Sequence, residues 1–183
     1  MPRPTKKTLL AVLSNPPVTD GKRTLARLQT VSGILGFENV EVANLFSLPS
    51  YRTGEISQLG VTEVGWLAAR AAISQGLTRA DGVLLAYGLG LPVGAARERF
   101  RDQVAWLTEQ LGERALPVWQ VGDGARHPSR WQRWTCRTHP DLAFPDALQR
   151  SLVVVVPAGS AASLRFEHGR DASRLPVDPV LAG

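Results

Sequence analysis

Asn15, Asn44 and His127 stand in three short polar segments of the chain, which read SNPP at 14–17, NLF at 44–46 and DGARHPSRW at 123–131. An asparagine side chain carries one acceptor and two donors, enough to orient a water molecule or to recognise the edge of a nucleobase. A histidine can donate a hydrogen bond to a group on which negative charge develops. These residue types predict a site in which a held water attacks and a leaving group departs.

The segments that must position these residues are predicted to be buried strands of a parallel sheet. Apolar or alternating runs lie at 8–14, 39–46, 82–88 and 115–122, and a further strand is predicted at 151–157. A polar motif follows or ends each of the first four runs, including the Tyr87-Gly88 pair. Because ligands bind outside the carboxyl ends of parallel strands, we expect all four motifs on one rim.

Helical patterns separate these strands, and residues 48–60 are predicted to form a loop. Apolar residues recur at helical spacing in three segments: Leu25, Leu28, Val31 and Leu35; Val64, Leu67 and Ala71; Val93, Phe100, Val104, Leu107 and Leu111. Gly36 is expected to end the first helix, and Pro92 to begin the third. Alternating strands and helices predict a three-layer α/β/α fold with a mostly parallel central sheet.

Each polar motif also has a simple structural explanation. Asn15 and Asp20 are typical of turns and helix caps, and Asn44 can close a strand end. Gly88 can serve a turn, and His127 can be a surface histidine with its hydrogen bonds satisfied. The coincidence of four motifs at four strand ends favours the functional interpretation.

Basic and aromatic residues surround His127. Arg126, Arg130, Arg133 and Arg137 alternate with Trp131 and Trp134, and no acidic residue lies between 126 and 137. Arginines neutralise phosphates and aromatic rings stack on bases, so Arg126, Arg130, Trp131 and Arg133 are predicted to contact nucleic acid. The alternative is an amphipathic turn in which the tryptophans pack in the core and the arginines are merely solvated.

Composition is consistent with a globular, nucleic-acid-binding protein. The 183 residues carry a net charge of +5 and a pI of about 10.1, which favours polyanionic partners such as nucleic acid. DNA is the expected partner rather than RNA. We expect one domain over 1–168, a loose tail over 169–183, and no span of a membrane. The single cysteine, Cys136, excludes an internal disulfide and a cysteine zinc site. A cytoplasmic protein without cofactor or metal is predicted.

The order of the motifs resembles a known bacterial family, domain of unknown function 1643. The matching segments are LLAVLSNPPVTDGKRTLARL, VEVANLFSLPS, GVLLAYG and GDGARHPSRW, which together extend over about residues 8–134. This chain has Pro17 where that family has serine, and Tyr87 where it has tryptophan.

More distantly, the same motifs resemble the uracil-DNA glycosylase superfamily. That resemblance implies that Asn15 positions the attacking water and that Asn44 reads the base. It also implies that His127 stabilises the departing base and that Ser129 contacts phosphate. Phe46, Tyr87 and Gly88 then belong to the substrate-binding set.

The resulting hypothesis is a base-excising N-glycosylase or a related nucleic-acid-processing hydrolase, acting on a normal or modified base. Asn15 can orient water but cannot act as a general base, so Asp20, the nearest carboxylate, is the candidate base. Two alternatives remain. One is a hydrolase of free nucleosides or nucleotides, and the other is a non-catalytic module that binds nucleic acid or another partner.

Overall fold

The computed structural model describes residues 6–50 and 53–155, which form five strands and six helices. The expected tail at 169–183 and the last two residues of the strand expected at 151–157 lie outside the described residues. The strands are β1 (Thr8–Leu13), β2 (Asn39–Asn44), β3 (Gly82–Leu85), β4 (Val118–Val121) and β5 (Leu152–Val155). The helices are α1 (Lys22–Leu35), α2 (Thr53–Leu59), α3 (Val64–Arg79), α4 (Ala95–Gly112), α5 (Pro128–Thr138) and α6 (Phe144–Ser151).

The strands form a single sheet in the order β2-β1-β3-β4-β5. The first four are mutually parallel, and β5 pairs antiparallel with β4. β1 lies between two neighbours, and five of its six residues are buried, which explains why its sequence is continuously apolar. The prediction of a mostly parallel sheet is confirmed.

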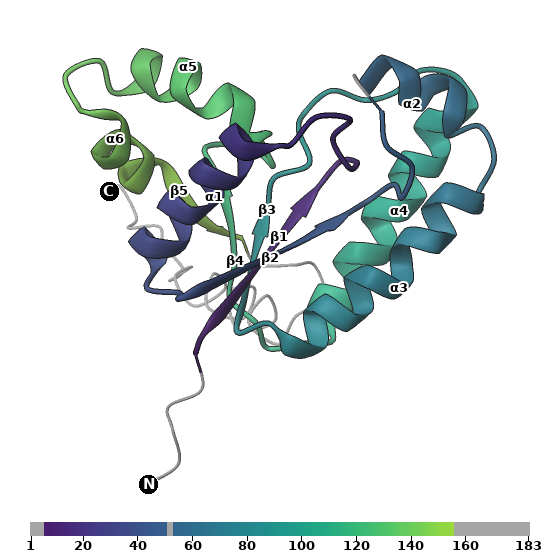
Figure 1. Ribbon diagram of the computed structural model, residues 1–183, viewed down its shortest axis with the longest axis horizontal. Helices are drawn as coiled ribbons and strands as arrows, with labels where there is room; N and C mark the ends of the chain where they lie inside the picture. The colour runs from purple at the N-terminus through teal and green to yellow at the C-terminus, as the bar shows by residue number, and fades with distance from the viewer. Residues whose placement is uncertain (1–5, 51–52, 156–183) are drawn as a thin grey trace, which may run out of the picture.

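Helices cover both faces of the sheet, as Figure 1 shows. Leu10 and Val12 of β1 pack in one core cluster with side chains of α2, α3 and α4. Leu9 and Ala11 point to the opposite face, where their cluster includes side chains of α1, α5 and α6. Successive side chains of β1 therefore point to opposite faces of the sheet and belong to two separate apolar layers. The result is a three-layer arrangement.

Three helices differ from expectation. α2 occupies part of the segment predicted to be a loop. The sequence gives little sign of this helix, because Ile56 is its one fully buried apolar side chain and a single residue shows no periodicity. α3 exists, but Val64 and Leu67 are exposed, and the helix buries Trp66 and Ile73 instead. α6, which directly precedes β5, was not expected.

Two further boundaries shift. α4 begins at Ala95, after Gly94, so that Val93 lies outside the helix and is exposed. The polar motif that contains His127 continues into the eleven-residue helix α5, which was not among the expected helices. The helix buries Pro128, Trp131 and Thr135, and the many arginines between them hide this inner face in the sequence.

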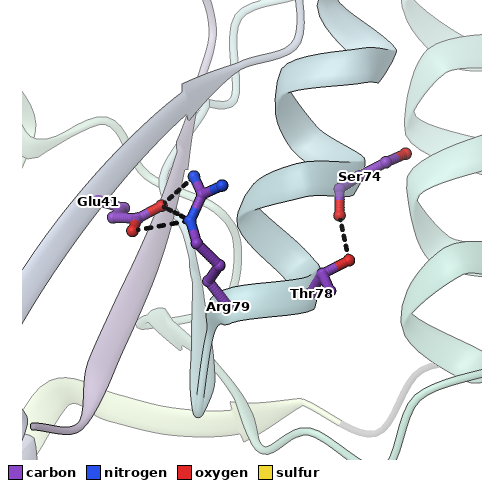
Figure 2. A network of polar contacts seen from close by, with 4 residues as sticks. All are labelled: Glu41, Ser74, Thr78 and Arg79. Atoms are coloured by element: carbon purple, nitrogen blue, oxygen red, sulfur yellow. Dashed lines mark hydrogen bonds and ion pairs between the residues drawn. The ribbon is translucent and has the colours of Figure 1, made fainter.

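An ion pair joins the end of α3 to β2, on the outer part of the sheet (Figure 2). The guanidinium of Arg79 donates to both carboxylate oxygens of Glu41, with its shortest contact at 2.7 Å. This interaction lowers the pKa of Glu41 and raises the pKa of Arg79. In the same view, the hydroxyl of Thr78 donates to the backbone carbonyl of Ser74, one turn earlier in α3.

Gly122 ends β4 in a conformation that only glycine adopts easily. Its φ is +73°, and a Cβ atom there would lie 2.6 Å from Cζ2 of Trp134. The backbone after β4 thus approaches α5 too closely for a side chain, and this approach sets where the indole of Trp134 lies.

We expect Gly122→Ala to lower the free energy of unfolding by about 2 kcal/mol, from the left-handed backbone and the clash together. Gly33→Ala, in α1, is the matched control, because a Cβ there meets nothing within 4 Å. It should raise stability by up to about 1 kcal/mol, the helix-propensity difference between the two residues. Urea denaturation measures both. Equal effects of the two substitutions would contradict both the backbone strain and the clash at Gly122.

Candidate functional site

A cavity of about 1040 Å³ opens where several elements meet at the carboxyl ends of β1 and β3. Its wall is formed by the turn after β1, the start of α1, the segment after β3 and one side of α5. The predicted site residues in this wall are Asn15, Asp20, Tyr87, Gly88, Arg126, His127, Ser129, Arg130 and Arg133. The structure therefore brings together residues from distant parts of the chain, and we call this the arginine-lined cavity.

His127 is the N-cap of α5, and its ring is held by the helix it begins. The backbone N–H of Ser129 donates to Nδ1 at 3.2 Å, and the Ser129 hydroxyl oxygen lies 2.9 Å from the same nitrogen. Burial lowers the pKa of His127, and the nearby positive charges of Arg27 and Arg130 lower it further. The ring is thus neutral near pH 7. Since Nδ1 accepts from the backbone, the proton of the ring is assigned to Nε2.

Asn15 is fixed by the backbone around it. Its Nδ2 donates to the carbonyl of Pro16 and to the carbonyl of Ser50, both at 3.0 Å. These bonds tie the turn after β1 to the loop after β2. The amide protons are used within the protein, so Asn15 can act on a ligand or a water through its acceptor Oδ1.

Asp20 lies in the cavity wall in an exposed position beside the start of α1. Its carboxylate forms an ion pair with the ammonium of Lys22 at 3.0 Å and accepts from the backbone N–H of Lys22 at 3.2 Å. The side-chain contact, and then the backbone hydrogen bond, lower the pKa of Asp20. A carboxylate stabilised in this way is a weaker proton acceptor, and its contacts are those of a turn residue.

The arginines give the cavity a positive wall. Arg126 is held by Asp123, with 2.6 Å between the guanidinium and the carboxylate, and it lies over the ring of Trp134 at 5.1 Å from the centroid. The hydrogen bond from Arg126 lowers the pKa of Asp123. Arg130, Arg133 and Arg137 are exposed along α5 and line the same cavity. Among the residues that the structure describes, Asp20 is the single acidic residue of the wall.

Asn44 does not line the cavity, although it lies next to it. It pairs in register with Leu13 of β1, and Leu13 belongs to the wall, as does Val42 on the same face of β2. Its Oδ1 is buried and has no hydrogen-bond partner within the described residues. The expectation that Asn44 shares one cavity wall with Asn15 and His127 is therefore not met in this structure.

Phe46 and Trp131 are core residues, and this corrects their expected contact with substrate and nucleic acid. Both are 0% exposed. Phe46 packs on Trp66, with 4.6 Å between ring centroids. The indole N–H of Trp131 donates to the carbonyl of Arg126 at 2.7 Å. Burying a large ring with its polar edge satisfied is more favourable than exposing it. Both rings therefore belong to the core beneath the site and do not contact a ligand.

Arg27 was missed by the sequence analysis, and it connects α1 to the start of α5. Its guanidinium donates to the carbonyl of Pro128 at 2.7 Å and to the side-chain oxygen of Gln132 at 3.2 Å. No local motif marks this residue, because its partners lie about a hundred positions away. Tyr87, which was expected in the site, is partly buried, and burial raises the pKa of its phenol, which therefore stays protonated.

The described residues contain no group of three or more His, Cys, Asp or Glu side chains able to hold a metal ion. No helix in that same part of the chain is long and apolar enough to cross a membrane. Comparison of the chain with models of protein families, with curated proteins and with solved structures finds no match in any of the three.

The lowered pKa of His127 predicts a pH-dependent stability. The unfolded chain protonates this ring near pH 6.5, but the folded protein does so only at lower pH. The free energy of unfolding should therefore fall as the pH drops below 6.5. His127→Asn keeps a capping acceptor without the titration, so its stability should change less between pH 7 and 5. Urea denaturation at both pH values tests this, and an identical pH dependence in both proteins would refute it.

Proposed function

We propose that the protein is a base-excising N-glycosylase or a related nucleic-acid-processing hydrolase, with DNA as the expected partner. The observation that carries the proposal is the position of His127. A neutral imidazole, with its Nδ1 engaged by the helix and its proton assigned to Nε2, stands in the same arginine-lined cavity as Asn15.

The chemistry of base release suits this arrangement. When an N-glycosidic bond breaks, negative charge develops on the base and positive charge on the sugar. A fixed Nε2–H donor stabilises the first of these without having to transfer a proton, and the arginines around it favour negative charge. Asn15 accepts a hydrogen bond from the attacking water through Oδ1 and so orients it.

The elongated positive wall favours nucleic acid over a free nucleoside or nucleotide. A nucleoside needs no arginines beyond the immediate binding pocket, and a nucleotide needs few. Here the exposed arginines continue from Arg130, one turn after the histidine, to Arg137 at the far end of α5. A polyanionic strand can use all of these charges at once, because each neutralised phosphate releases counterions.

One observation favours the second candidate, a non-catalytic nucleic-acid-binding module. Asp20, the single acidic residue of the wall, is ion-paired with Lys22, and both bonds from Nδ2 of Asn15 go to backbone carbonyls. Such a cavity has no strong general base. It can bind a nucleic acid and leave the glycosidic bond intact.

Incubation with a panel of oligonucleotides that carry normal and modified bases, followed by detection of abasic sites, tests the proposal. We expect His127→Ala to slow single-turnover base release by about 10²–10³, the usual effect of losing one preorganised donor. Binding of an uncleavable analogue should change much less, because the donor acts mainly as charge develops.

His139→Ala is the matched control, since this histidine ends α5 and does not line the cavity. It should leave the rate close to that of the wild type. If no base is released from DNA, RNA or free nucleotides, the catalytic proposal fails. DNA binding without base release would then support the non-catalytic module.

A further inference from the structure

Arg130, Arg133 and Arg137 form a row along α5, which we call the arginine row. Their spacing of three and four residues places them on one side of the helix, and all three line the arginine-lined cavity. The row begins one turn after His127 and leads away from it. Its geometry is set by a regular helix rather than by a loop.

The three arginines of the row form no ion pair with a carboxylate among the described residues. In residues 6–50 and 53–155, Arg79, Arg99 and Arg126 each form an ion pair with a carboxylate, whereas none of the three row residues does so. All three are exposed, but they face a cavity and not a convex surface. Three like charges on one helix face repel each other, so the row costs stability unless an anion joins it.

We propose that the arginine row binds consecutive phosphates of a single nucleic-acid strand, which runs from His127 along α5. This inference rests on the proposed function, and it adds the path of the strand. Helix rise of about 1.5 Å per residue separates the first and last arginines by about 10 Å. Since a single strand carries one phosphate per nucleotide, a row of this length can contact about two or three consecutive phosphates.

The shape and the charges favour a strand over other polyanions. A free nucleotide at His127 concentrates its phosphates at one point and reaches only the near end of the row. A membrane surface is flat and contacts a concave wall poorly. A strand with one phosphate per nucleotide matches a linear series of guanidinium groups, and arginine contacts phosphate with a two-pronged geometry.

The experiment measures binding of single-stranded oligodeoxynucleotides of two to eight nucleotides at several salt concentrations. For the wild type, the log–log salt slope should steepen with length until the row is occupied and then level off. Arg137→Ala should change little for the shortest strands. For the longer strands it should weaken binding and reduce the slope by about 0.7, the value for one phosphate on a single strand.

Arg150→Ala is the matched control, because it removes the same charge from exposed Arg150 in α6, outside the cavity wall. It should leave the slopes unchanged. The proposal is overturned if Arg137→Ala affects short and long strands equally, if it has no effect, or if inorganic polyphosphate reproduces the full length dependence. These readouts need no base release, so the strand path and the catalytic proposal can fail separately.

Discussion

The hydrogen bond from the backbone N–H of Ser129 to Nδ1 of His127 is the interaction on which the candidate site depends. It begins α5, because it satisfies one of the backbone donors that every helix leaves open at its first turn. It engages Nδ1 and so assigns the ring proton to Nε2. It also fixes the origin of the arginine row, since the directions of Arg130, Arg133 and Arg137 follow from where the helix starts.

Long-range contacts keep this helix start at the edge of the sheet. Trp131 fills the core beneath it and bonds back to the carbonyl of Arg126, and Arg27 reaches from α1 to the carbonyl of Pro128. Gly122 lets the backbone after β4 approach Trp134 closely. Gly122 and Trp131 do not line the cavity, yet they help to determine where the basic side chains of α5 lie.

The sequence predicts the strands well because burial on both faces leaves a continuous apolar run, as in β1. It predicts the α1 stop correctly, since Gly36 ends that helix in a left-handed conformation. Prediction of helices from the sequence fails where few apolar residues are buried, or where several apolar residues compete for the same face. α2 buries one isoleucine fully, and Trp66 displaces Val64 and Leu67 from the inner face of α3 through packing that no local pattern reveals.

The candidate site likewise has features that the sequence predicts and features that it does not. Proximity of Asn15 to His127 follows from topology, because both come after strands whose carboxyl ends share one edge. The burial of Phe46 and Trp131 does not follow, since an aromatic residue in a polar motif serves equally well as a stacking surface or as a core anchor. Only the three-dimensional packing decides between them, as it does for the contacts of Arg27 with α5.

Two costs to stability lie next to the cavity. Asn44 Oδ1 and Arg126 Nε are the two buried side-chain polar atoms that lack a hydrogen-bond partner across the described part of the chain. A buried group of this kind typically costs about 1–3 kcal/mol. Arg126 belongs to the cavity wall, and Asn44 pairs in register with Leu13 of that wall. Both atoms have almost no exposed surface, and Asn44 does not line the cavity, so the packing of the core at this end of the sheet must offset their cost.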